Sequence, residues 1–105
     1  PATIETTVPH RSGAGKQEGG NFMNERILVA DDEPDIADLV CLYLQNENFQ
    51  TIPCYSGREA LEQIQKEKPD LAILDIMMPG TSGLFVCRKI RETDAYPVIF
   101  LTANG

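Results

Sequence analysis

The sequence has few of the residues that bind nucleic acids. Only 9 of its 105 residues are Lys or Arg, against 16 Asp or Glu, which gives a formal net charge of −7. The segment that begins at Met23 contains 14 of these acids and 7 of these basic residues, so it carries the whole excess. Because DNA and RNA binding needs clustered Lys and Arg, we expect no direct nucleic-acid contact by this segment.

The sequence also lacks the patterns of a zinc site and a membrane span. Its three cysteines, Cys41, Cys54 and Cys87, lie far apart and form no CxxC motif or Cys/His cluster. They fall within apolar helix and strand patterns, so we expect small buried side chains in a reducing cytosol. No apolar run approaches the length of a bilayer span, and no signal-peptide pattern opens the chain. These absences predict a soluble cytoplasmic protein without membrane contact.

Residues 1–22 differ in composition from the rest of the chain. They are rich in Thr, Ser, Gly and Pro and show no sustained hydrophobic period. The stretch GAGK within them has neither the spacing nor the preceding strand of a phosphate-binding loop. The shift in composition at Met23 predicts a disordered leader or tag over 1–22 and a single domain over 23–105.

From Met23 onward, short apolar runs alternate with amphipathic segments of helical period. Ser56 followed by Glu59 matches a capping box and marks the start of the second helical segment. The alternation of strands with helices, and strands that are apolar on both faces, predict an α/β fold with a parallel sheet covered by helices on both sides. We predict strands at 26–30, 49–54, 71–74 and 97–101, and helices at about 34–46, 56–67 and 84–93.

Acidic or hydroxyl side chains follow three of the four predicted strands. Asp31 and Asp32 come after the first strand, Asp75 after the third and Thr102 after the fourth. Right-handed crossovers bring the carboxyl ends of parallel strands to one edge of the sheet, where ligands bind. Three carboxylates in one crevice repel each other unless a cation lies among them, and oxygen-only ligands favour Mg²⁺ over zinc. We therefore predict a Mg²⁺ site held by Asp31 and Asp32.

Carboxylates around Mg²⁺ are typical of phosphoryl transfer, and a carboxylate can itself be the nucleophile that forms an aspartyl phosphate. Asp75 stands alone at its strand end, so we interpret it as this nucleophile, with Thr102 donating a hydrogen bond to the phosphate. Any one acid alone is better explained as a helix cap, as Asp32 illustrates. The joint placement of the acids after separate strands favours the functional interpretation.

At these positions the sequence resembles the receiver domains of bacterial two-component response regulators, in particular those of winged-helix transcription regulators. The resemblance covers nearly everything from Met23 to the end. It implies a flavodoxin-like, doubly wound parallel α/β sheet, of which this chain has four strands and three helices. The matching segments are ILVADDEPDI at 27–36, LAILDIMMPGTSGLFVCRKIR at 71–91 and PVIFLTA at 97–103.

The resemblance implies a role for each matching residue. Asp75 accepts a phosphoryl group from a sensor histidine kinase, so the domain catalyses its own phosphorylation and is not an enzyme in the usual sense. Asp32 and Asp75 bind Mg²⁺ through their carboxylates, Met77 through its backbone carbonyl and Asp31 largely through water. Thr102 is the switch hydroxyl. Pro79 and Gly83 shape the loop and the start of the third helix, whereas by residue type alone Met77 and Met78 would be core or loop hydrophobes.

The chain departs from the family pattern after the fourth predicted strand. The family continues with a fifth strand, further helices and a Lys that contacts the phosphate, and no Lys here follows a suitable strand. We therefore expect the fourth strand, Val98 to Leu101, to present an exposed apolar edge, and we expect self-association or domain swapping through it.

Two alternatives to a phosphorylatable signalling module remain open. An aspartate-nucleophile phosphatase would need a second acid two residues after the nucleophile, and Met77 occupies that position. An inactive receiver fragment, kept for folding or assembly, is compatible with both the leader and the missing Lys. The sequence names neither the cognate kinase nor the output domain.

Overall fold

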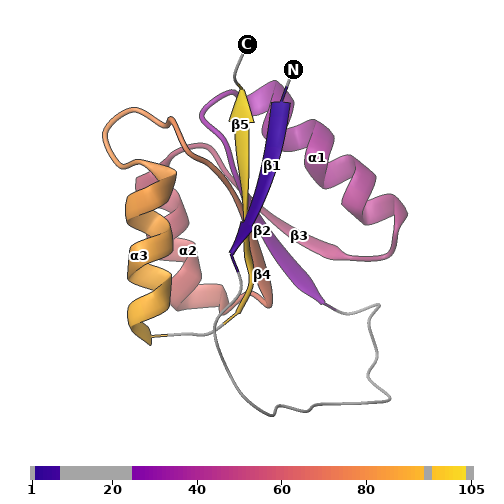
Figure 1. The fold of residues 1–105 in the computed structure, drawn as a ribbon. Helices are drawn as coiled ribbons and strands as arrows, with labels where there is room; N and C mark the ends of the chain where they lie inside the picture. Colours follow the sequence, from indigo (N-terminus) through magenta and orange to yellow (C-terminus); the bar gives the residue numbers. More distant parts are fainter. Residues whose placement is uncertain (1, 8–24, 94–95, 104–105) are drawn as a thin grey trace.

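The protein forms a single sheet with helices on both faces (Figure 1). The computed structural model describes residues 2–7, 25–93 and 96–103. The strand order in the sheet is β1-β5-β4-β2-β3. The strands are β1 (Ala2–Thr7), β2 (Arg26–Ala30), β3 (Gln50–Cys54), β4 (Leu71–Asp75) and β5 (Val98–Ala103), and the helices are α1 (Pro34–Asn46), α2 (Gly57–Glu67) and α3 (Gly83–Thr93).

The structure confirms the predicted α/β architecture. Strand β2 pairs in parallel with β3 and β4, and β4 pairs in parallel with β5, so four strands run in the same direction. Helix α1 covers one face of the sheet, and α2 and α3 lie together on the other (Figure 1). The predicted strand and helix bounds agree with the observed ones to within two residues. Among the described residues, no helix has the length and apolar character needed to span a bilayer.

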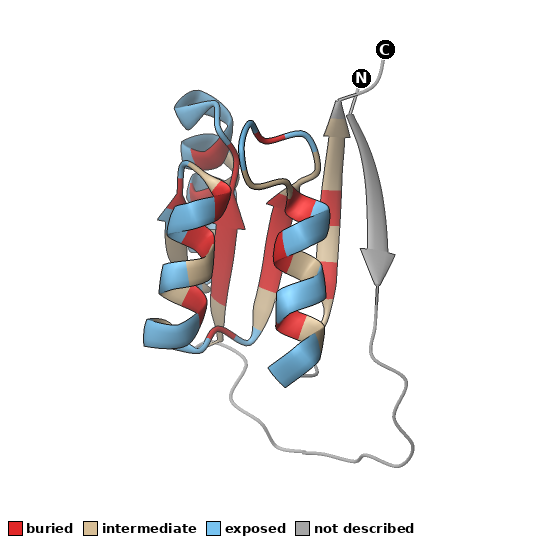
Figure 2. Ribbon diagram, turned by 90° about the vertical axis from the view of Figure 1, so that its left-hand side faces the viewer, coloured by how far each residue is buried: buried red, intermediate tan, exposed pale blue. Residues whose placement is uncertain are grey.

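The alternation of side chains along β2 divides the core into two layers. Leu28 and Ala30 pack with residues of α2 and α3, whereas Ile27 and Val29 pack with residues of α1. All four side chains are buried, as Figure 2 shows for the strands between the helices. Burying a side chain such as Leu28 contributes roughly 2 kcal/mol, so these layers hold the strand ends in fixed positions.

Helix α2 begins with the predicted capping box. The Ser56 hydroxyl accepts a hydrogen bond from the backbone N–H of Glu59 at 3.1 Å. In return, the Glu59 carboxylate accepts one from the backbone N–H of Tyr55 at 2.8 Å. The helix ends where Lys68 adopts the left-handed conformation and its N–H bonds to the carbonyl of Ile64. These contacts confirm the sequence prediction at both ends of the helix.

The N-terminal segment differs from the expectation that it takes no part in the fold. Ala2–Thr7 form β1, which pairs antiparallel with β5 over six residues. The edge of the fourth predicted strand is therefore covered and not exposed as expected. The physical reason is that a strand edge has unpaired N–H and C=O groups, which any extended segment within reach can satisfy. Thr and Ile, which favour strands, make up most of this segment. The other residues of the predicted leader lie outside the described residues.

Candidate metal centre

Three carboxylates meet at the carboxyl edge of the parallel strands. In the register of the sheet, Ala30 of β2 lies opposite Leu74 of β4, so the next residues, Asp31 and Asp75, are also neighbours. One carboxylate oxygen from each of Asp31, Asp32 and Asp75 lies within 4.8 Å of the other two. The structure thus brings together the acids that the sequence placed at separate strand ends.

Backbone hydrogen bonds hold Asp31 in place. Its side chain is 5 % exposed, and its backbone N–H donates to the carbonyl of Cys54 in β3 at 3.1 Å. Its carboxylate accepts a hydrogen bond from the backbone N–H of Glu33 at 2.9 Å, in the turn that leads to α1. Because both contacts use backbone groups, the position of this carboxylate follows from the path of the chain.

Asp75 is held by the loop that follows it. Its carboxylate accepts a hydrogen bond from the backbone N–H of Met77 at 3.2 Å. The side chain of Met77 is 77 % exposed, so this residue contributes to the site through its backbone, whereas Met78 is buried in the core. By residue type, both methionines were expected to be core or loop hydrophobes. Met78 lies in the core and Met77 lies in the loop, as expected.

Burial and repulsion from neighbouring acids raise the pKa values of Asp31 and Asp75. The pKa of Asp75 rises to about 6, because burial disfavours its charge and the charges of Asp31 and Asp32 add to this effect. The hydrogen bond from Met77 opposes the rise. Burial likewise raises the pKa of Asp31. The hydrogen bond from the Glu33 N–H lowers this pKa, and the charge of Asp32 raises it further. A divalent cation bound among these carboxylates offsets their mutual repulsion.

The donor set fits a hard cation such as Mg²⁺. Every candidate ligand atom is a carboxylate oxygen, and no His or Cys takes part in the group. Hard divalent cations prefer such oxygen ligands, whereas zinc sites use nitrogen and sulfur.

Thr102 lies at the same edge of the sheet as the acids. In the parallel register of β4 and β5, Asp75 is opposite Leu101, so Thr102 is one residue beyond the position of Asp75. The backbone N–H of Ile76 donates to the carbonyl of Leu101 at 3.3 Å, which ties this end of β5 to the loop after β4. The structure therefore places Thr102 beside the strand end that carries Asp75.

Two glycines allow the loop after Asp75 to pack tightly. A Cβ atom at Gly83 would overlap the carbonyl oxygen of Asp75, and one at Gly57 would overlap the carbonyl oxygen of Thr81. The first N–H of α3, at Gly83, bonds to the carbonyl of Ile76 at 3.0 Å. The sequence motif indicates Gly83 as part of this loop, whereas no motif marks Gly57, whose small size is needed for contact with a segment that is distant in the sequence.

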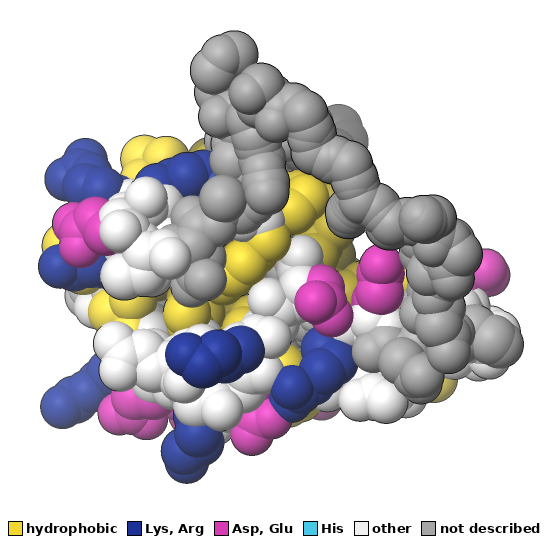
Figure 3. Space-filling model, turned by 90° about the horizontal axis from the view of Figure 1, so that it is seen from below, with side chains coloured by type: hydrophobic (Ala, Val, Ile, Leu, Met, Phe, Trp, Pro, Cys, Tyr) yellow, Lys and Arg dark blue, Asp and Glu magenta, His cyan; other side chains and the backbone are white. Residues whose placement is uncertain are grey.

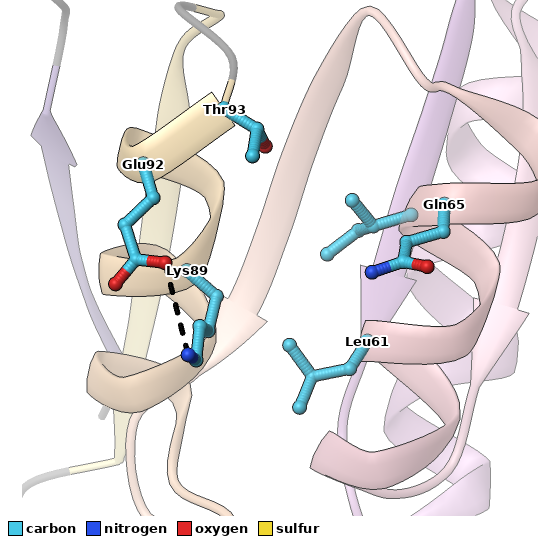
Figure 4. Close-up of a pocket in the computed structure, with 6 residues that line it drawn as sticks. Leu61, Gln65, Lys89, Glu92 and Thr93 are labelled. Atoms are coloured by element: carbon cyan, nitrogen blue, oxygen red, sulfur yellow. Dashed lines mark ion pairs between the residues drawn. The ribbon is translucent and has the colours of Figure 1, made fainter.

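The cavity between α2 and α3 is separate from the acidic group. It has a volume of about 240 Å³, and its lining comes from the part of α2 that begins at Leu61 and from the last turns of α3 (Figure 4). Lys89 and Glu92 form an ion pair at 3.7 Å on its wall. These segments lie at the far ends of the helices from Gly57 and Gly83, so the cavity does not include the acids. The lining residues are Leu61, Ile64, Gln65, Lys89, Glu92 and Thr93.

The end of the molecule opposite the acidic group carries a mixed surface. Seen from below, Lys and Arg side chains lie beside Asp and Glu side chains, with apolar side chains between them (Figure 3). No single charge dominates this view. The group of three acids at the carboxyl edge is therefore a local feature, because the opposite end of this acidic chain shows no comparable excess of Asp and Glu.

Comparison with known proteins finds similar sequences among bacterial regulatory proteins. The chain is 59 % identical over 82 residues to the regulatory protein VanR of Enterococcus faecium, covering 78 % of this chain and 36 % of that protein. It is 41 % identical over 82 residues to the DNA-binding response regulator MtrA of Mycolicibacterium smegmatis, with the same coverage of each. The chain thus spans 36 % of the length of these curated relatives.

Solved structures of receiver domains share the fold. The BeF₃-activated N-terminal receiver domain of Klebsiella pneumoniae RstA matches with a TM-score of 0.72 and 34 % identity, over 77 % of this chain and 69 % of that chain. The response regulator TrrA of Thermotoga maritima, in complex with Mg²⁺-BeF, matches with a TM-score of 0.63 and 47 % identity, over 65 % of this chain and 59 % of that chain. The family model of the response regulator receiver domain matches residues 27–105. This chain therefore belongs to the response regulator receiver domain family.

Proposed function

We propose that this receiver domain accepts a phosphoryl group on Asp75 as part of two-component signalling. The observation that carries the proposal is the meeting of Asp31, Asp32 and Asp75 within 4.8 Å at the carboxyl edge of the sheet. A receiver domain is a phosphoacceptor and not a conventional enzyme. In the proposed step, a carboxylate oxygen of Asp75 attacks the phosphorus of the donor. The bond between phosphorus and the donor's leaving atom breaks, and an acyl phosphate remains on Asp75.

The chain's own residues prepare Asp75 for this step. The hydrogen bond from the Met77 N–H fixes one carboxylate oxygen of Asp75, which leaves the other to attack. The raised pKa of Asp75 means that its charge is poorly stabilised by the protein alone, so the charged form is a stronger base. Thr102 lies one register position beyond Asp75 and supplies the hydroxyl that donates to the new phosphate.

Receiver domains bind Mg²⁺ in an acidic pocket, and we infer which residues hold it here. Asp32 and Asp75 bind through carboxylate oxygens, Met77 through its backbone carbonyl and Asp31 largely through water. When bound, Mg²⁺ neutralises the negative charge that gathers on the phosphoryl oxygens. The relative TrrA was solved with Mg²⁺-BeF, which supports a site of this type in the family.

The phosphoryl donor and the output of the signal are part of the same proposal. We propose that a sensor histidine kinase supplies the phosphoryl group and that this domain acts in the cytoplasm. The relative MtrA is described as a DNA-binding response regulator, which supports a transcription regulator as the parent of this domain. The described part of this chain contributes an acidic site, so we assign no direct nucleic-acid contact to it. A phosphatase activity is disfavoured, because Met77 has no proton to donate at the position of the general acid.

Phosphorylation by acetyl phosphate tests the proposal. We expect the wild-type chain to take up the labelled phosphoryl group of acetyl phosphate when Mg²⁺ is present. A chelator that removes Mg²⁺ is expected to prevent this labelling. Asp75→Asn removes the acceptor and is expected to abolish labelling. Asp35→Asn is the matched control, because Asp35 is an acid of the first turn of α1 outside the acidic group. Labelling that persists in Asp75→Asn would contradict the proposal, and a folded wild-type chain that takes no label would indicate an inactive fragment.

A further inference from the structure

The loop that carries two of the three acids is fastened to the end of β3 on both sides. Before the loop, the backbone N–H of Asp31 donates a hydrogen bond to the carbonyl of Cys54 at 3.1 Å. Beyond the loop, in the second turn of α1, the Asp38 carboxylate accepts a hydrogen bond from the hydroxyl of Tyr55 at 2.7 Å. Two consecutive residues, Cys54 and Tyr55, therefore hold the two ends of segment 31–38.

The start of α1 differs from the starts of the other two helices. Its N-cap residue, Glu33, makes no side-chain hydrogen bond to the helix, whereas a serine caps each of α2 and α3. Helix α1 lies by itself on its face of the sheet, whereas α2 and α3 lie together (Figure 1). Within 34–40, only Ala37 is buried, so the first two turns have little apolar contact with the sheet. Such a helix start opens easily, and the acids directly before it move with it.

Tyr55 supplies a contact that holds this helix start. Its backbone N–H donates to the Glu59 carboxylate at 2.8 Å, so Tyr55 is itself fixed by the capping box of α2. Its hydroxyl donates to a charged acceptor, which makes the hydrogen bond stronger than one between neutral groups. This hydrogen bond to Asp38 raises the pKa of the Tyr55 hydroxyl, which therefore remains a donor at neutral pH. The side chain of Tyr55 thus links the capped start of α2 to the start of α1.

We infer that Tyr55 is a positioning residue, which holds the start of α1 through Asp38 and thereby keeps the acids of the preceding loop in place for Mg²⁺. The inference rests on the proposed function, because it concerns the same acidic group. Ligands that are already in place lose less conformational freedom when a cation binds. The hydrogen bond between Tyr55 and Asp38 is therefore expected to raise the affinity of the domain for Mg²⁺.

Two variants of the full chain separate this role from a general loss of stability. Tyr55→Phe removes one hydroxyl and changes no charge. The matched control is Gln45→Met, because the Gln45 side chain donates to the Thr51 hydroxyl at 2.7 Å and so joins α1 to β3 at their ends far from the acids. We expect both variants to lose a similar, small amount of stability in urea denaturation. We expect only Tyr55→Phe to bind Mg²⁺ about threefold more weakly in calorimetric titration.

Amide exchange in the metal-free protein gives a readout that does not depend on Mg²⁺. The N–H groups of Ile36 and Ala37 donate to the carbonyl of Glu33 in the first turn of α1. We expect these amides to exchange with solvent about threefold faster in Tyr55→Phe than in Gln45→Met, because the helix start opens more often. Equal exchange rates in the two variants would overturn the inference.

Substitutions of Asp38 separate the hydrogen bond from the charge. Asp38→Asn keeps an acceptor oxygen, whereas Asp38→Ala does not. We expect Asp38→Ala to weaken Mg²⁺ binding as much as Tyr55→Phe does, and the double variant to lose no more than either. Asp38→Asn should keep most of the affinity. An equal loss in Asp38→Asn and Asp38→Ala would assign the effect to charge and contradict a role of the hydrogen bond.

The Mg²⁺ titrations also distinguish failure of this inference from failure of the proposed function. A wild-type chain that binds Mg²⁺ with the same affinity as Tyr55→Phe would overturn the role of Tyr55 and leave the metal site intact. An equal loss of affinity in Gln45→Met would do the same, because that residue lies far from the acids. A folded wild-type chain that binds no Mg²⁺ would contradict both.

Discussion

Gly83 packs directly against the backbone of Asp75. A Cβ atom at Gly83 would overlap the Asp75 carbonyl oxygen, and it would also lie 3.1 Å from the Cα of Ile76. The start of α3 therefore rests on the residue that carries the proposed phosphoacceptor carboxylate. Any side chain at position 83 must displace either the start of α3 or the end of β4, and a shift of the end of β4 moves Asp75 relative to Asp31 and Asp32.

Replacement of Gly83 by Ala is expected to weaken both folding and metal binding. Overpacking against backbone costs about 1–3 kcal/mol in the free energy of unfolding, and the moved carboxylate lowers the affinity for Mg²⁺. Chemical denaturation and calorimetric Mg²⁺ titration measure the two effects. Gly80→Ala is the control, because Gly80 has a φ of +80° but no atom within 4 Å of its would-be Cβ. This variant should lose about 1 kcal/mol through backbone strain alone and keep its Mg²⁺ affinity.

The stability of the metal-free protein is expected to fall as the pH rises through the titration of Asp75. The folded-state pKa is about 6 against an ordinary value of 3.8, so the folded protein binds more protons than the unfolded chain between these values. Stability is therefore lost as the pH rises from about 4 to about 6 and stays lower above that range. The raised pKa of Asp31 acts in the same direction.

Asp75→Asn tests the origin of this pH dependence. The variant should be more stable than the wild type at pH 7 without metal, and its stability should change less between pH 4.5 and 7. Urea denaturation at the two pH values, with a chelator present, gives the comparison. A wild-type protein that gains stability over this pH range, or an Asn variant with the same slope, would contradict the raised pKa of Asp75.

The helix caps of α2 and α3 provide a second matched pair. Ser56 accepts a hydrogen bond from the N–H of Glu59, and Ser82 accepts one from the N–H of Phe85 at 3.2 Å. Replacement of either serine by Ala should cost about 1 kcal/mol of stability. Only Ser82→Ala should also weaken Mg²⁺ binding, because α3 begins against Asp75. Equal Mg²⁺ affinities of the two variants would show that the cap of α3 does not position the site.

Cys54 is expected to resist alkylation in the folded protein. Its side chain is fully buried, and burial raises the pKa of its thiol to about 12, so little thiolate is present at pH 8. Cys87 is half-buried and should react first with iodoacetamide, as mass spectrometry of the peptides will show. Denaturation in urea should remove the difference between the two residues. Rapid modification of Cys54 without unfolding would contradict its place in the core.

The sequence predicted the features that depend on local patterns. Asp31 and Asp75 follow apolar runs, and parallel strands bring their ends together, so the acidic group followed from periodicity and topology alone. The role of β1 did not follow, because its pairing depends on the edge of β5, which lies far away in the sequence. The need for Gly57 was likewise hidden, since its reason is the approach of Thr81 from another loop.

An amide NMR spectrum recorded with and without Mg²⁺ tests the central claim most directly. The claim is that Asp31, Asp32, Asp75 and Met77 form one Mg²⁺ site at the carboxyl edge of the sheet. The account predicts dispersed peaks, and it predicts that the amides of these four residues shift together as Mg²⁺ is added, with the cavity residues Leu61 and Gln65 unchanged. Peaks that remain in place at saturating Mg²⁺, or shifts confined to other acidic residues of the chain, would contradict it.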